Sequence, residues 1–340
     1  MTRLQFSAIA LSAALVVPAI QICALPQSPP PQLAQANAAL QAGEADKALE
    51  LLKSAPAQDA EPAAARNLEC RVRYSLGQWD AAATNCEEAV RLDEKNGEFH
   101  LWLGRTLGEK ADRASFLTAY SLAKRVRGEF EQAVQLNPRD ADALADLGEF
   151  YRQAPQFLGG GIDKAEGVAG KLDGVDAARA HELRGHIAVG RKDYDSAERE
   201  YKQAITTAAH PALQWITLAS FYRDRQRLDD MESAIHSAVT AAHRDIHASI
   251  ALYDGASVLA KAHRNLELAA TMLQDYLASP AKSEEAPAFV AHVRLARIKQ
   301  QLGDHAAASR ERAAALALAH DYKPALELNP QDNGNQEERH

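Results

Sequence analysis

The sequence predicts an all-α fold, built as a solenoid of about eight helical hairpins. Three observations lead to this prediction. A similar unit recurs about every 34 residues, which is the length of one helical hairpin. Within each unit, small residues occupy positions where two helices must touch, and aromatic or large aliphatic residues lie beside them. Pro138 and Pro211 fall between units, where a proline ends the preceding helix.

The composition suits closely packed helices and argues against nucleic acid as a partner. Hydrophobic residues make up 46% of the 340 residues but aromatic residues only 6%, so much of the apolar surface is alanine. Alanine favours helix and lets two helices approach closely. The formal net charge is -8, and no basic stripe with interleaved aromatic residues occurs. We therefore expect no nucleic-acid partner.

Residues 1–24 are typical of an export signal peptide. Arg3 supplies a positive start, and the apolar run from Ala8 to Ile22 is short for a membrane span and is broken by Pro18. Cleavage after Ala24 would leave a mature chain with no stable membrane span in an oxidising periplasmic or extracellular space.

A lipid anchor on Cys23 is the alternative at this end of the chain. Bacterial lipoprotein processing favours a small residue before the cysteine, and Ile22 stands there, which argues against the anchor. Residues 25–32 follow as a proline-rich spacer, since its prolines disfavour helix.

The solenoid is predicted over residues 33–322, and each hairpin is placed by the small residue in its second helix. The units begin near Pro29, Ala63, Gly97, Ala141, Ala178, Ala212, Ile250 and Phe289. Their second-helix alanines are Ala48, Ala82, Ala165, Ala197, Ala269 and Ala308. Residues 323–340 form a C-terminal segment, whose polar last ten residues, Gln331 to His340, we expect to be disordered.

Two units depart from the common length. The third is lengthened by about ten residues around Glu109 to Leu122, and the fourth carries a loop from Pro155 to Gly161 between its helices. The purely structural interpretation of Gly159 to Gly161 is a turn that lets the chain reverse direction, with Phe157 and Leu158 packed against the hairpin. A contact element is the alternative.

The pattern inside the hairpins resembles the tetratricopeptide repeat. The clearest copies are Trp215, Leu218, Ala219 and Tyr222 in a first helix, and Tyr194, Ala197, Tyr201 and Ala204 in a second helix. The resemblance covers about Gln32 to Tyr322 and is weak in the first and seventh units. The segments HLWLGRTLGEKADRA and QAPQFLGGGIDKAE are also similar to a group of exported bacterial repeat proteins with a long third unit and a glycine-rich loop.

The resemblance implies a right-handed superhelix whose concave wall, made by the first helices, binds an extended peptide. The residues expected to line this groove are Asn67, Arg71, Arg105, Arg152, His186 and Arg223. Of these, Asn67, Arg71 and Arg105 resemble the amide and basic side chains with which some members of the family clamp a peptide carboxylate. The alternative is that helix faces turned to water carry charges in any case.

Cys70 and Cys86 lie in the two helices of one hairpin and are the only cysteines after the signal peptide. If the hairpin turns near Gln78, the two residues fall at matching heights, where their Cβ atoms meet the geometry of a disulfide. Two small buried hydrophobic side chains are the alternative interpretation.

No catalytic, cofactor or metal site is predicted. His181 and His186 resemble a zinc-protease helix, but they are five positions apart, about 140° around a helix, and zinc needs a spacing of four. Gly159 to Gly161 and Lys164 lack the Gly-Lys-Ser/Thr order and the preceding strand of a phosphate-binding loop.

The sequence therefore favours a non-catalytic adaptor or scaffold of the bacterial cell envelope, binding a peptide or protein in its groove. The alternative function is a small-ligand-binding or enzymatic helical domain, with the extended third unit around Phe116 and Tyr120 and the Gly159 to Gly161 loop forming a pocket. Self-association through the terminal hairpins is a third interpretation, and the sequence fixes neither the partner nor the oligomeric state.

Overall fold

The computed structural model describes residues 31–54, 61–245, 248–280 and 282–329. Over these residues it confirms the predicted all-α solenoid, and its helices pair into hairpins in chain order. The first five hairpins are α1 (Pro31–Ala42) with α2 (Ala45–Ser54), α3 (Pro62–Ser75) with α4 (Trp79–Leu92), α5 (Gly97–Asp112) with α6 (Phe116–Leu136), α7 (Ala141–Gln153) with α8 (Ile162–Leu172), and α9 (Ala177–Gly190) with α10 (Tyr194–Thr207). The last three are α11 (Ala212–Asp224) with α12 (Leu228–Ala242), α13 (Ile250–Lys261) with α14 (Leu266–Ala278), and α15 (Ala288–Gln301) with α16 (His305–Leu318).

Two short helices complete the described chain. The 3-10 helix η1 (Gln156–Leu158) lies between α7 and α8, and α17 (Lys323–Leu326) follows α16. No described helix combines the length and the apolar character that crossing a bilayer requires.

Local signals in the sequence start and stop these helices. Aspartate side chains accept backbone amides at the N-termini of α7, α9, α10 and α16, through Asp140, Asp176, Asp193 and Asp304. Such N-caps satisfy amides that have no partner within the helix. These four helices therefore begin at a polar residue that precedes the apolar pattern.

Small residues let the two helices of a hairpin touch. Ala82 and Ala197 are fully buried between helices. A Cβ atom added to Gly185 would lie 2.4 Å from the ring of Tyr201, and one added to Gly104 would lie 2.5 Å from the ring of Phe130. The large rings occupy the space that the missing side chains leave, which is the packing that the sequence pattern predicts.

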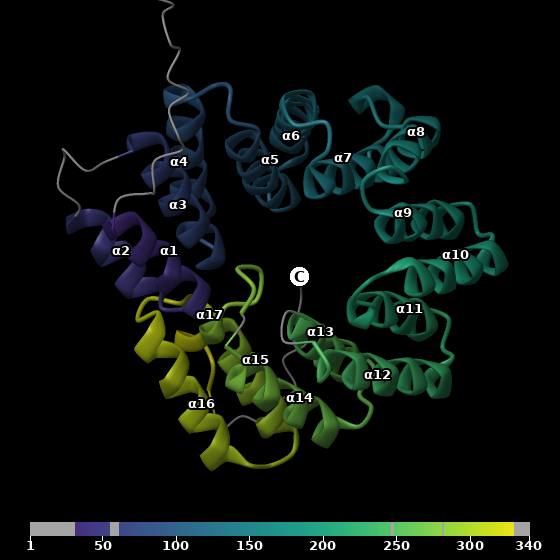
Figure 1. Ribbon diagram of the computed structural model, residues 1–340. Helices are drawn as coiled ribbons and strands as arrows, with labels where there is room; N and C mark the ends of the chain where they lie inside the picture. The colour runs from purple at the N-terminus through teal and green to yellow at the C-terminus, as the bar shows by residue number, and fades with distance from the viewer. Residues whose placement is uncertain (1–30, 55–60, 246–247, 281, 330–340) are drawn as a thin grey trace, which may run out of the picture.

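The array closes on itself into a ring. Figure 1 shows the hairpins following one another round a circle until α15, α16 and α17 lie beside α1 and α2. One hydrophobic cluster joins the two ends of the chain, with Leu40 and Val72 from the first hairpins and Phe289 and Val293 from the last. At this seam a Cβ atom on Gly43 would lie 2.3 Å from the backbone nitrogen of Ala288, so only glycine allows the approach.

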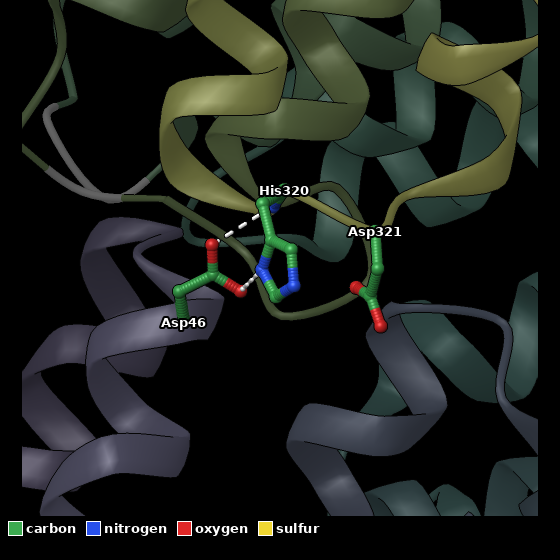
Figure 2. A group of neighbouring side chains, drawn as sticks. All are labelled: Asp46, His320 and Asp321. Carbon is green, nitrogen blue, oxygen red and sulfur yellow. Dashed lines mark hydrogen bonds and ion pairs between the residues drawn. The ribbon is translucent and has the colours of Figure 1, made fainter.

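Polar contacts also cross the seam. The Asp46 carboxylate accepts a hydrogen bond from the backbone nitrogen of His320 at 2.8 Å and pairs with its Nδ1 at 2.9 Å (Figure 2). Gln78 donates to Asp321 at 2.9 Å. A carboxylate oxygen of Asp46, a ring nitrogen of His320 and a carboxylate oxygen of Asp321 lie within 4.8 Å of one another. Asp46 comes from the first hairpin, whereas the other two residues follow the last.

The structure refines several boundaries. Helix α1 begins at Pro31, inside the predicted spacer and two residues before the predicted start of the solenoid, because proline is tolerated in the first turn of a helix. The predicted C-terminal segment begins with α17. The signal peptide, Cys23 and the last ten residues lie outside the described residues.

Candidate binding surface on the inner wall

The first helix of each hairpin faces the inside of the ring. Figure 1 shows α5, α7 and α11 nearer the centre than α6, α8 and α12. All six residues predicted for the groove lie on first helices, from α3 to α11. In the structure, however, the charged members of this set have ion-pair partners within the chain, which the sequence does not reveal.

Arg71 of α3 holds a carboxylate, and that carboxylate belongs to the chain itself. Its Nε donates to Glu284 Oε2 at 2.8 Å, and its Nη2 donates to Glu284 Oε1, which makes the pair bidentate. Glu98 lies 3.4 Å from its Nη1. Although burial opposes the charge, the hydrogen bond and attraction of Glu284 raise the pKa of Arg71. Arg71 therefore binds an acid of the chain itself, and its binding of a peptide carboxylate stays a prediction.

Trp102 of α5 connects Arg71 with Arg105. The two guanidinium carbons lie 5.5 Å and 5.1 Å from the centroid of its ring, within reach of a cation–π attraction. Arg105 Nε donates to Asp146 Oδ2 at 2.6 Å. Burial raises the pKa of Asp146, and the neighbouring Arg105 charge opposes this rise. We call Arg71, Trp102 and Arg105 the inner cluster.

A pocket opens beside the inner cluster. It has a volume of about 470 Å³ and is lined by Asn96, Gly97, Glu98, Leu101, Trp102, Arg105, Asn137, Asp140 and Asp142. These residues come from the start of α5, the α6–α7 connection and the start of α7. An indole ring, a guanidinium group and several oxygen acceptors can together hold a peptide side chain and its backbone.

Further round the wall, Arg152 and His186 share one acid. Arg152 Nε donates to Glu149 Oε2 at 2.8 Å, and His186 Nδ1 pairs with Glu149 Oε1. Burial opposes the charge of Glu149, but the hydrogen bond and charge of His186, with those of Arg152, lower its pKa to about 2. These two predicted residues therefore lie together.

The remaining two predicted residues are less suited to a ligand. Arg223 donates to its sequence neighbour Asp224 at 2.7 Å and lies apart from the inner cluster on α11. Asn67 is only 3% exposed, and its Oδ1 has no hydrogen-bond partner among the described residues. Arg71 and Arg105 are thus brought together, while Arg152 with His186 and Arg223 occupy separate stretches of the wall.

The other motifs find structural partners. His181 Nδ1 pairs with Glu200 at 2.7 Å, whereas His186 pairs with Glu149, so the two histidines do not converge. Lys164 donates to the carbonyl of Gly159 at 2.7 Å. Cys70 and Cys86 are joined in a disulfide with a Cα to Cα distance of 5.3 Å.

Sequence reasoning missed Trp102, Asp146 and Glu284. Trp102 stands three positions before Arg105 on a helix, which places the two side chains on one face. This spacing is a sequence signal that Trp102 lies beside the predicted groove residue. Glu284 offers none, because it is 213 residues from Arg71 and meets it only through ring closure.

Comparisons with known proteins find similarity among solved structures only. A scan against protein-family models finds no match, and neither does a search of the curated proteins. Among solved structures, a thermophilic TPR protein of Thermus thermophilus is similar at 19% identity and a TM-score of 0.47, over 56% of this chain and 96% of its own. A tetratricopeptide repeat protein of Parabacteroides merdae has 15% identity and a TM-score of 0.43, over 87% and 95%. Pseudomonas aeruginosa PilF has 15% identity and a TM-score of 0.35, over 69% and 96%.

The hairpins follow the repeat pattern that the sequence predicts. Their length, their order and the glycine and alanine contacts between paired helices all follow the pattern quoted from the sequence. The described chain is accordingly an all-α solenoid of helical hairpins, whose sequence pattern resembles the tetratricopeptide repeat and whose last hairpin meets the first.

Proposed function

We propose that this protein is a non-catalytic scaffold of the bacterial cell envelope that binds a peptide or protein on the inner wall of its ring. The supporting observation is the contact between Arg71 and the Glu284 carboxylate next to Trp102 and Arg105. Arg71 already binds the chain's own Glu284, and this pair is an example of how a guanidinium on this wall binds a carboxylate. Arg105, which lines the neighbouring pocket, offers a second guanidinium to an acidic peptide.

The pocket beside the inner cluster supports the same proposal. Trp102 and Leu101 offer apolar surface, and Arg105 and Asn96 offer donors that fix the orientation of a bound chain. Repeat folds present extended surfaces suited to polypeptide partners, which makes a scaffold a better proposal than an enzyme.

Affinity capture from an envelope fraction, followed by mass spectrometry, tests this function. Arg105→Glu reverses a charge of the inner cluster without touching the seam, and we expect it to lose the acidic partner that the natural chain retains. Arg91→Glu is the matched control, because Arg91 is an exposed arginine on the outer helix α4, paired with Glu88 of the same helix. Circular dichroism verifies that both variants are helical. Recovery of the same partners by all three proteins would refute binding at the inner cluster.

The alternative of a ligand pocket at the third and fourth units receives less support. Phe116 and Phe157 are 79% and 64% exposed, so these rings lie on open surface and do not enclose a small molecule.

A further inference from the structure

The two departures from the repeat length meet in space. The lengthened α6 begins with Phe116 and Leu117, and η1 carries Phe157 in the loop of the next hairpin. Tyr120 of α6 stacks on Phe157 with ring centroids 6.1 Å apart and an angle of 16° between the ring planes. We call Phe116, Leu117, Tyr120 and Phe157 the aromatic tip.

The aromatic tip protrudes into solvent. Leu117 is 81% exposed, Phe116 79% and Phe157 64%. Side chains that line a groove are shielded by its walls. The high exposed fractions of these three side chains therefore indicate a convex projection. Gathered large apolar side chains in water are unfavourable and mark a surface that meets another phase or molecule.

The loop that carries Phe157 is firmly held. Gly160 and Gly161 donate their amides to the carbonyls of Pro155 and Tyr151, at 3.2 Å and 2.8 Å. Arg127 of α6 donates to the carbonyl of Leu158 at 3.2 Å. A Cβ atom on Gly159 would lie 1.8 Å from Arg127 Nη1, so the glycine permits this contact. Phe157 is therefore displayed by a fixed turn.

Positive charge accompanies the tip. The segment 113–128 contains Arg113, Lys124, Arg125 and Arg127 and no acidic residue, in a chain of net charge -8. Arg113 and Arg127 pair with Glu109 and Glu131, each four residues away along the chain. Arg125 pairs with Glu87 of α4. Lys124 has no carboxylate partner among the described contacts, and its Nζ lies 4.5 Å from the centroid of the Tyr120 ring. An uncompensated cation thus stands at the base of the apolar projection.

From this geometry we propose that the aromatic tip docks the protein on an anionic lipid surface. Phe116, Leu117 and Phe157 enter the interfacial layer, and Lys124 meets headgroup phosphates. A soft bilayer accepts a convex projection, whereas a protein partner would need a matching hollow. The tip lies on the second helix α6 and on η1, whereas the inner cluster lies on the first helices α3 and α5, so docking is independent of the proposed inner-wall function.

Vesicle co-sedimentation tests this proposal. The protein is the chain from Leu25 onward, which contains every described helix and omits the apolar Ala8 to Ile22 run that would itself bind lipid. The probes are vesicles of phosphatidylcholine alone and of phosphatidylcholine with phosphatidylglycerol. We expect stronger binding to the anionic vesicles, and weaker binding as salt screens the Lys124 charge.

Variants at other exposed apolar positions separate the tip from the rest of the surface. The triple change Phe116→Ser, Leu117→Ser and Phe157→Ser should weaken binding to anionic vesicles by about tenfold or more, because it removes the inserted apolar area. Leu92→Ser with Leu213→Ser, at residues 39% and 38% exposed elsewhere, should leave binding unchanged. Lys124→Glu should abolish the preference for anionic over neutral vesicles.

Two results would overturn the proposal. One is that the natural sequence fails to sediment with anionic vesicles, and the other is that the triple variant, helical by circular dichroism, sediments equally well. If the natural sequence instead forms dimers that the triple variant loses, while no vesicle binding occurs, the tip is a protein contact and the lipid assignment is wrong.

Discussion

Gly160 shows how one missing side chain holds the loop between α7 and α8 in place. A Cβ atom on this residue would lie 1.8 Å from the carbonyl oxygen of Ala154, which is backbone and cannot turn away. The Gly160 amide also donates to Pro155. The glycine is therefore required by the close approach of two backbone segments.

Gly160→Ala should destabilise the protein by about 1 to 3 kcal/mol, because the added methyl group forces these segments apart. Gly170→Ala is the matched control in the neighbouring helix α8, where no described neighbour lies within 4 Å of the added Cβ atom. That variant should gain up to about 1 kcal/mol, since alanine favours helix over glycine. Urea denaturation measures both, and equal stabilities would contradict the contact.

Asp254 illustrates a charge held at an energetic cost. Burial in α13 raises its pKa to about 6, from 3.8 for an ordinary aspartate, and the attraction of Arg294 only partly opposes the rise. Because the folded state holds the proton more tightly than the unfolded state, this group favours folding at low pH. Its favourable contribution is complete below about pH 4 and is lost as the pH rises through about 6.

Asp254→Asn should therefore stabilise the protein by about 1 to 2 kcal/mol at about pH 8, where it removes a buried charge, and by much less at about pH 4.5. Urea denaturation at both pH values provides the test. Asp195→Asn, at an exposed position in α10, is the control and should show no such change. A gain independent of pH would show that the carboxylate charge is not responsible.

At the scale of the element, the hairpin of α3 and α4 combines a covalent link with the common packing. Cys70 and Cys86 are both fully buried and joined by the disulfide, while Ala82 provides the close contact. The pairing could be anticipated from the sequence because both cysteines lie within one hairpin, where register follows from the position of the turn. The loop that it closes is short, so its stabilisation is modest.

Reduction, or replacement of both cysteines by alanine, should lower the free energy of unfolding by about 3 kcal/mol. Denaturation with and without reductant measures the loss, and the double variant should not respond to reductant. Titration of the unfolded, unreduced full chain should find one thiol, that of Cys23. Three thiols would mean that the bond is absent.

At the scale of the whole molecule, the ring is closed by the Arg71–Glu284 ion pair and an apolar cluster, together with the Asp46–His320 and Gln78–Asp321 contacts. Arg71 and Glu284 are 16% and 12% exposed, so separating them leaves a buried charge without its partner. Glu98 is also near Arg71, and a glutamate at position 71 would face two carboxylates.

Arg71→Glu should cost roughly 3 kcal/mol and loosen the seam, which small-angle scattering would detect as a larger radius of gyration. The exchange Arg71→Glu with Glu284→Arg should recover much of the stability and the compact dimensions. Arg91→Glu on the exposed face of α4 serves as the control. Identical scattering for the single variant and the natural chain would show that this pair does not hold the ring closed.

Hairpin register could be predicted because most units have local markers, such as Gly185, whose missing side chain leaves room for Tyr201 of the paired helix. Closure could not, since it depends on small rotations accumulated over every repeat interface and on partners such as Glu284 that no local pattern identifies. The same limit applies to the candidate site. Asn67, Arg71 and Arg105 lie on first helices, as the sequence predicts. The burial of Asn67 and the acids that pair with the two arginines could not be predicted, because no local pattern identifies them.

The meeting of the first and last hairpins has a further consequence. An open array exposes two apolar end faces, which must be capped or else stick to other molecules, and a second copy can add there indefinitely. Here Phe289 and Leu40 cover each other's faces within one chain, so end-to-end polymerisation is blocked by the architecture itself. A chain circularly permuted to begin at another hairpin would keep every interface of the original.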